Sequence, residues 1–229
     1  MFRQSGFFWS ALLFMAGTLV YSTQGIAETA NHRDFERVYR VTITNLTRGQ
    51  VFSPPLLATH TSSVALFELG ESAIGELATL AEEGNGEPLA TLLDDLPQVY
   101  EARATSDMIL PGASMTFEIR SKYYFRQFST AGMLVDTNDA FFAIDGQPLP
   151  WRKGQRTSWE AEAYDAGSEA NNEHCDFVPG PACGGSSRDT GGAEGYVHVH
   201  AGVHGIADLM SSQSDWRNPV AQVTVVRVR

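Results

Sequence analysis

The sequence contains only two cysteines, Cys175 and Cys183, in the stretch C-D-F-V-P-G-P-A-C. Their spacing is longer than the C-x₂₋₄-C spacing of zinc sites, which normally also include further soft ligands. In an oxidising compartment the pair can close a small loop. We therefore predict a disulfide between Cys175 and Cys183, with a pair of metal-bound thiolates as the alternative.

Signatures of common enzymes are also lacking. The sequence has no G-x-S-x-G, H-E-x-x-H or G-x-x-x-x-G-K-[ST] motif, and no G-x-G-x-x-G after a predicted strand. Two carboxylates can still meet in space, as a glycosidase requires, but a chain with 27 acidic residues brings some pair together by chance. We therefore expect no catalytic residues and keep a hydrolase as the alternative.

Long apolar runs are lacking as well. The longest amino-terminal run, Phe7 to Val20, is shorter than the roughly 20 residues that a bilayer-spanning helix needs. Arg3 precedes the run, and Gly25-Ile26-Ala27 offers the small residues that a signal peptidase reads. This pattern predicts a signal peptide over residues 1–27, removed before Glu28, and a secreted or periplasmic protein without a permanent membrane anchor. The alternative is a buried amino-terminal helix.

Positive charge is scarce: 16 Lys and Arg stand against 27 Asp and Glu, a formal net charge of −11. Nucleic acid and anionic membrane surfaces are therefore not expected as general partners. A negative field does favour cations, although many secreted proteins are acidic simply to stay soluble. Residues 28–229 are enough for one domain with a substantial core.

Alternation of apolar and polar residues predicts mostly β-structure. Candidate strands are Val38–Thr44, Ser114–Arg120, Ala131–Val135, Trp159–Tyr164, Tyr196–Ala201 and Val220–Val228. Ser62–Glu83 has helical spacing instead, with Thr61 to Ser63 as the N-cap and Gly84 as the stop, and a second short helix is expected over Pro88–Leu96. The pattern favours an all-β sandwich with a helical insertion near the amino terminus. The glycine-rich run 180–195 is expected to be a functional or mobile loop.

One short segment, A-Y-D-A-G-S-E-A-N-N-E-H-C-D-F at 163–177, gathers four acidic residues around Gly167. These residues are Asp165, Glu169, Glu173 and Asp176. Two interpretations remain open at this point: a solvated acidic loop, or a site for a hard cation that prefers oxygen ligands.

Three histidines lie close together in Y-V-H-V-H-A-G-V-H-G-I. Strand alternation places His198 and His200 on one face, and His204 follows the Gly202 turn. Two imidazoles on one face of a strand can bind a transition metal. The alternative, which we favour, is a set of hydrogen-bonded histidines that shape the turn, since no third ligand is evident from spacing.

The chain from about Tyr39 to Val228 contains, in this order, S-P-P at 53–55, H-T-S-S at 60–63, A-G-M-L-V-D-T-N-D-A-F-F-A-I-D at 131–145, Y-D-A-G-S-E at 164–169 and the carboxy-terminal valine strand. Together these segments resemble a spondin domain, the amino-terminal module of F-spondin-like matrix proteins, which also occurs as stand-alone secreted bacterial proteins. The resemblance implies an antiparallel β-sandwich akin to calcium-dependent lipid-binding modules. It also implies a calcium ion held by loops at one end, and a role in adhesion or matrix binding.

The family's calcium ligands carry over to Asp139, Asp165, Glu169 and the carbonyl of Tyr164. Two positions depart from the family: Glu169 stands where aspartate is usual, and Ala140 replaces a tryptophan. Glutamate still offers a carboxylate, so calcium binding should survive with altered geometry. By contrast, Glu173 and Asp176 are expected to be solvated or held beside the disulfide.

Two classes of function follow. The first is a secreted, calcium-binding, spondin-like module that binds an extracellular protein or glycan. The alternative is a metal-dependent hydrolase that uses His198, His200 and nearby acids. The two differ in one observable: whether the histidines converge with carboxylates in a pocket or lie apart on the sheet.

Overall fold

The computed structural model describes residues 36–229, which belong to one compact unit. The predicted signal peptide, residues 1–27, and the expected start at Glu28 lie outside the described residues. Residues 36–229 contain no helix with the length and apolar character that crossing a membrane requires.

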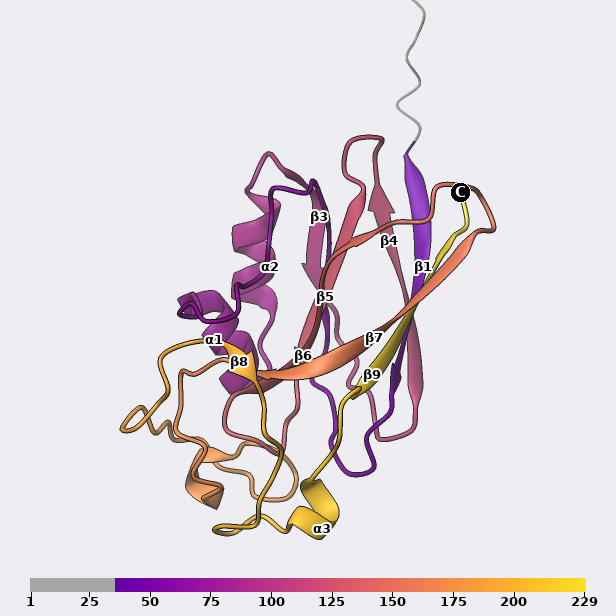
Figure 1. The fold of residues 1–229 in the computed structure, drawn as a ribbon. Helices are drawn as coiled ribbons and strands as arrows, with labels where there is room; N and C mark the ends of the chain where they lie inside the picture. Colours follow the sequence, from indigo (N-terminus) through magenta and orange to yellow (C-terminus); the bar gives the residue numbers. More distant parts are fainter. Residues whose placement is uncertain (1–35) are drawn as a thin grey trace, which may run out of the picture. The chain divides into compact units, whose positions relative to one another are not determined.

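The described chain is all-β, as predicted, and every strand pair is antiparallel. The strands follow the order β3-β2-β5-β6-β7-β9-β1-β4, and β8 pairs with β7 (Figure 1). Their bounds are β1 Arg37–Asn45, β2 Leu56–His60, β3 Val99–Ala104, β4 Ser114–Ser121, β5 Gln127–Met133, β6 Ala140–Pro148, β7 Arg156–Asp165, β8 His198–Val199 and β9 Ala221–Arg227.

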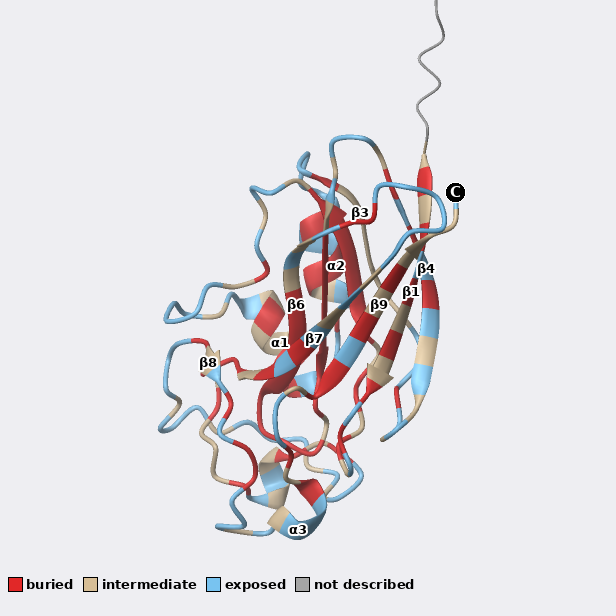
Figure 2. Ribbon diagram, turned by 45° about the vertical axis from the view of Figure 1, so that its right-hand side comes forward, coloured by how far each residue is buried: buried red, intermediate tan, exposed pale blue. Residues whose placement is uncertain are grey.

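The sheet curls until its two ends nearly meet. Thr59 Oγ1, on β2, donates to the Arg120 carbonyl of β4 at 2.7 Å, and the Arg120 amide donates to Glu101 Oε2 of β3 at 2.7 Å. Alternate side chains therefore face an enclosed core. On β1, Val41 and Ile43 are fully buried, whereas Arg40, which precedes Val41 in the same strand, is exposed. Figure 2 shows this alternation of buried and exposed positions along the strands.

The helical prediction is only partly correct. The first helix, α1, runs from Gly75 to Glu83, so residues 62–74 are not helical and the predicted N-cap at 61–63 is wrong. Gly84 does end the helix, in the left-handed conformation with φ +68°. The second helix, α2, spans Glu87–Asp94, and Pro88 lies in its first turn.

Residues 62–74 are drawn into an irregular loop by a contact with the sheet. The Leu66 amide donates to Asp145 Oδ2 on β6 at 3.0 Å, and Gly70 has a φ of +89° that an α-helix does not allow. Leu69, which the helical pattern assigns to a buried face, is 59 % exposed. A second apolar cluster packs α1 and α2 against β2, β5 and β6.

The predicted disulfide between Cys175 and Cys183 is present. It closes a loop that begins with a short 3₁₀ turn, Cys175–Phe177. The loop is also held from inside the fold, because the Ala182 amide donates to Oδ1 of the buried Asp136 at 2.9 Å.

Replacing both cysteines by serine is expected to lower the free energy of unfolding by about 2 to 3 kcal/mol, the loop-closure value for a loop of this size. Urea denaturation of the double variant and of the oxidised wild type measures this difference. An unchanged denaturation midpoint would show that the loop is held by its other contacts alone.

Candidate metal centre

Two aspartates are placed side by side by strand register. Asp139 immediately precedes β6 and Asp165 ends β7, where Ala140 pairs with Asp165. The Ala166 amide donates to the Asp139 carbonyl at 3.2 Å, which fixes the two strand ends to each other. Both side chains are fully buried. Two carboxylates are therefore removed from water at one point, which is costly unless a proton or a cation compensates their charge.

The Asp139 carboxylate is held by one of its oxygens only. Its Oδ2 accepts the Ser168 amide at 2.7 Å, the Ser168 hydroxyl at 3.1 Å and the Glu169 amide at 3.0 Å. Its Oδ1 is buried and has no hydrogen-bond partner within residues 36–229. A buried carboxylate oxygen without a donor calls for an explanation, and an ion is one of them.

Asp165 anchors the turn that follows β7. Its Oδ1 accepts the Gly167 amide at 2.7 Å, and its Oδ2 accepts the Asn171 side-chain amide. Gly167 has a φ of +65°, and a Cβ there would lie 2.3 Å from the Tyr196 carbonyl oxygen. Only glycine fits this turn.

The short strand β8 brings His198 opposite Asp165. His198 Nδ1 lies 3.1 Å from the Val199 carbonyl, which places the ring proton on Nδ1. Its Nε2 lies 3.7 Å from Asp165 Oδ1 and, within the described chain, is buried without a hydrogen-bond partner. The Nε2 nitrogen of His198 therefore faces a buried carboxylate.

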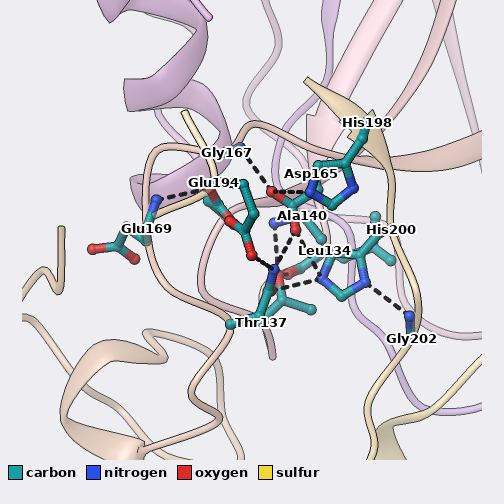
Figure 3. Close-up of polar contacts among 12 residues, drawn as sticks. Leu134, Thr137, Ala140, Asp165, Gly167, Glu169, Glu194, His198, His200 and Gly202 are labelled. Atoms are coloured by element: carbon teal, nitrogen blue, oxygen red, sulfur yellow. Dashed lines mark hydrogen bonds and ion pairs between the residues drawn. The ribbon is translucent and has the colours of Figure 1, made fainter. Parts of the chain in front are cut away.

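Glu194, which lies in the glycine-rich loop, forms a group with Asp165 and His198. One ligand atom each of Asp165, Glu194 and His198 lie within 4.8 Å of one another (Figure 3). The Asn171 amide reaches both acids, since it also donates to Glu194 Oε1 at 3.3 Å. Glu194 is exposed, so the group is open to solvent on that side.

The pKa values reflect the crowding of acids. Burial, and after it the charge of Asp165, raises the pKa of Asp139 to about 7. Burial also raises the pKa of Asp165. Burial and the charge of Glu82 raise the pKa of Glu169 to about 8. Each of these shifts makes the charged form harder to maintain, and a bound cation would favour it.

The residues expected to bind calcium are only partly brought together. Asp139 and Asp165 are neighbours, and the backbone amide of Glu169 donates to the Asp139 carboxylate. The Glu169 carboxylate, however, points away from Asp165 in Figure 3, and its Oε1 accepts the Asp189 amide at 3.1 Å. Tyr164 lies in β7 between ladder partners on β6 and β8.

The histidines separate into three roles. His200 lies 3.7 Å from Asp165 Oδ2, but both of its nitrogens are engaged: Nε2 contacts Asn171 Oδ1 at 3.1 Å and Nδ1 accepts the Gly202 amide at 2.9 Å. Burial lowers the pKa of His200 to about 4, so it is neutral. The side chain of His204 is exposed. Of the two histidines beside Asp165, only His198 has a ring nitrogen without a hydrogen-bond partner within the described residues.

The sequence did not single out Glu194 or Asn171. Only their positions in the sequence could have indicated a role in the site. Glu194 lies in the glycine-rich run, four residues before His198, and Asn171 lies in the acidic segment. We call the group of Asp165, Glu194 and His198 the candidate metal centre. Beside it is a cavity of about 220 Å³, lined among others by Asn171, Glu194, His198 and His200.

Glu173 was expected to be solvated or held beside the disulfide, and the first of these alternatives is wrong. It is buried, and its carboxylate accepts the backbone amides of His204 at 2.5 Å, Gly205 at 2.7 Å and Ile206 at 2.8 Å. Asp176 is exposed, as expected. Glu173 therefore holds the loop after β8.

No protein-family model and no curated protein matches this chain.

Proposed function

We propose that the protein is a secreted or periplasmic binding module of the spondin type, whose loops at one end of the sheet are held by a divalent cation. The disulfide between Cys175 and Cys183 supports an oxidising compartment, where such bonds persist. Adhesion to an extracellular protein or glycan is the role that the spondin resemblance implies.

The observation that carries the proposal is the pair of buried aspartates at the ends of β6 and β7. Asp139 Oδ1 and His198 Nε2 are both buried and lack hydrogen-bond partners within residues 36–229. The carboxylate oxygen of Asp139 carries lone pairs, so a cation satisfies it and a further hydrogen-bond acceptor does not. The donor set therefore fits a cation.

Calcium is the ion we propose first, because calcium prefers oxygen ligands and the carboxylates of Asp165 and Glu194 lie together. The buried Asp139 adds a third carboxylate at the start of the neighbouring strand β6. It accepts variable coordination numbers, so the exposed side can be filled by water. Glu169 would have to turn from Asp189 to join the ion, as the spondin pattern implies.

A second candidate rests on His198. The notable feature is that His198 and His200 converge with Asp165 beside a cavity, which is the arrangement expected of a metal-dependent hydrolase. A set of two carboxylates and one imidazole suits a transition metal such as zinc, with open positions for water or substrate. This candidate needs His198 as a ligand, whereas calcium binding does not.

Calorimetric titration of the metal-stripped protein with calcium, magnesium and zinc tests the proposal. We expect calcium to bind, magnesium to bind poorly because it demands tight octahedral geometry, and His198→Gln to retain calcium. Zinc binding that is lost in His198→Gln, with turnover of a chromogenic ester by the zinc-loaded wild type, would favour the hydrolase. Failure of all three ions to bind would overturn both candidates.

A further inference from the structure

The end of the sheet opposite to the metal centre is rich in positive charge. The segments K-Y-Y-F-R at 122–126 and L-P-W-R-K-G-Q-R at 149–156 carry five Lys and Arg and no acid, in a chain whose net charge is −11. Strand β7 separates this end from the metal centre, because it begins at Arg156 and ends at Asp165. At the usual strand rise of roughly 3.3 Å per residue, the two ends lie about 30 Å apart.

The two segments form one surface, which we call the basic aromatic surface. The Leu149 amide donates to the Arg126 carbonyl at 2.8 Å, and the rings of Tyr123 and Trp151 meet edge to face with centroids 5.5 Å apart. Three aromatic side chains are exposed on it: Tyr123 by 57 %, Tyr124 by 78 % and Trp151 by 40 %. Large exposed aromatic groups beside unpaired charge are typical of binding surfaces.

Guanidinium groups are ordered on the Trp151 ring. The Arg37 guanidinium carbon lies 4.0 Å from the ring centroid and that of Arg126 lies 5.0 Å from it. Stacking holds a guanidinium by its face and leaves its N–H edge free to donate. Arg37 is buried beneath the ring, whereas Arg126 is exposed and can meet a ligand.

The exposed cations of this surface are not neutralised by the described part of the chain. Within residues 36–229, the side chains of Arg126, Arg152, Lys153 and Arg156 form no ion pair. All four residues are exposed. They are spread over two loops instead of lining one cavity, so the matching partner carries several negative charges along its length.

We propose that the basic aromatic surface binds an acidic polysaccharide, a chain of sugars bearing carboxylate or sulfate groups. Arginine donates to both anions with matching geometry, and aromatic rings pack against sugar rings. An anionic membrane fits less well, because neither segment exposes a Leu, Ile, Phe or Met and Trp151 is held by Arg37. This inference does not depend on the cation site.

The test is binding of the full-length exported protein to heparin and to polygalacturonate in EDTA, which removes any contribution of the metal centre. We expect Arg152→Ser/Lys153→Ser to raise Kd roughly tenfold, which corresponds to about 1.4 kcal/mol. Binding should also weaken as salt rises, since the contacts are between exposed charges. Both substituted residues are exposed, so folding should be unaffected.

The matched control is Arg40→Ser/Arg217→Ser, which removes the same charge from exposed positions outside the two segments. It should bind as the wild type does. Equal weakening in both double variants, equal binding of neutral dextran, or no binding to either acidic polysaccharide would overturn the proposal. Binding to phosphatidylglycerol vesicles without polysaccharide binding would assign the surface to a membrane instead.

Discussion

Asp165→Asn is expected to remove most of the stabilisation that calcium gives to the folded protein. An ion that binds only the folded state stabilises it by RT ln(1 + [L]/Kd), about 2.7 kcal/mol at a hundredfold excess over Kd. Asparagine keeps nearly the same volume but loses the negative charge that faces Glu194 and His198. The melting temperature of the metal-stripped wild type should therefore rise with calcium, and that of the variant should change little.

Asp176→Asn is the matched control, because it makes the same chemical change at an exposed residue of the same acidic segment. It should keep the full calcium response. A variant at Asp165 that still responds like the wild type would remove Asp165 from the ligands. If millimolar calcium does not change the melting temperature of the wild type, the segment after β7 is an acidic loop that binds no ion.

The sheet could be predicted from the sequence because its signal is local. Alternation along β1 directly encodes which side chains face the core, and Val41 and Ile43 are buried as that pattern requires. The helix predicted over 62–83 was too long because its first half is decided by a distant contact. Asp145 holds the Leu66 amide across 79 residues of sequence, and local spacing carries no information about it.

The candidate metal centre could be predicted only in part. Asp139 and Asp165 become neighbours through the pairing of β6 and β7, a register that only the family resemblance could suggest. Glu194 comes from a glycine-rich loop without regular periodicity, so nothing local marked its direction. The carboxylate of Glu169 turns toward the Asp189 amide, since a longer side chain can satisfy itself on a neighbouring loop.

The burial of Glu173 could not be predicted from the local sequence either. Its sequence neighbours are polar, which favours exposure, yet it is buried because the loop after β8 folds over it. Its φ of +57° is rare for a residue other than glycine. The hydrogen bonds to residues 204–206 and one from the Asp208 amide to its carbonyl, at 3.1 Å, hold this conformation.

Glu173→Gln is expected to lower the free energy of unfolding by about 2 to 4 kcal/mol. The variant loses the negative charge, and an NH₂ group replaces one of the two carboxylate oxygens that accept the backbone amides of residues 204–206. Urea denaturation measures the loss, and hydrogen exchange should show faster exchange at 204–206. Glu160→Gln, at an exposed position on β7, should be neutral. Glu173→Gly separates two causes: it relieves the strain of a positive φ, so a loss as large as that of glutamine would assign the effect to the hydrogen bonds, and a gain in stability would show that the carboxylate contributes little.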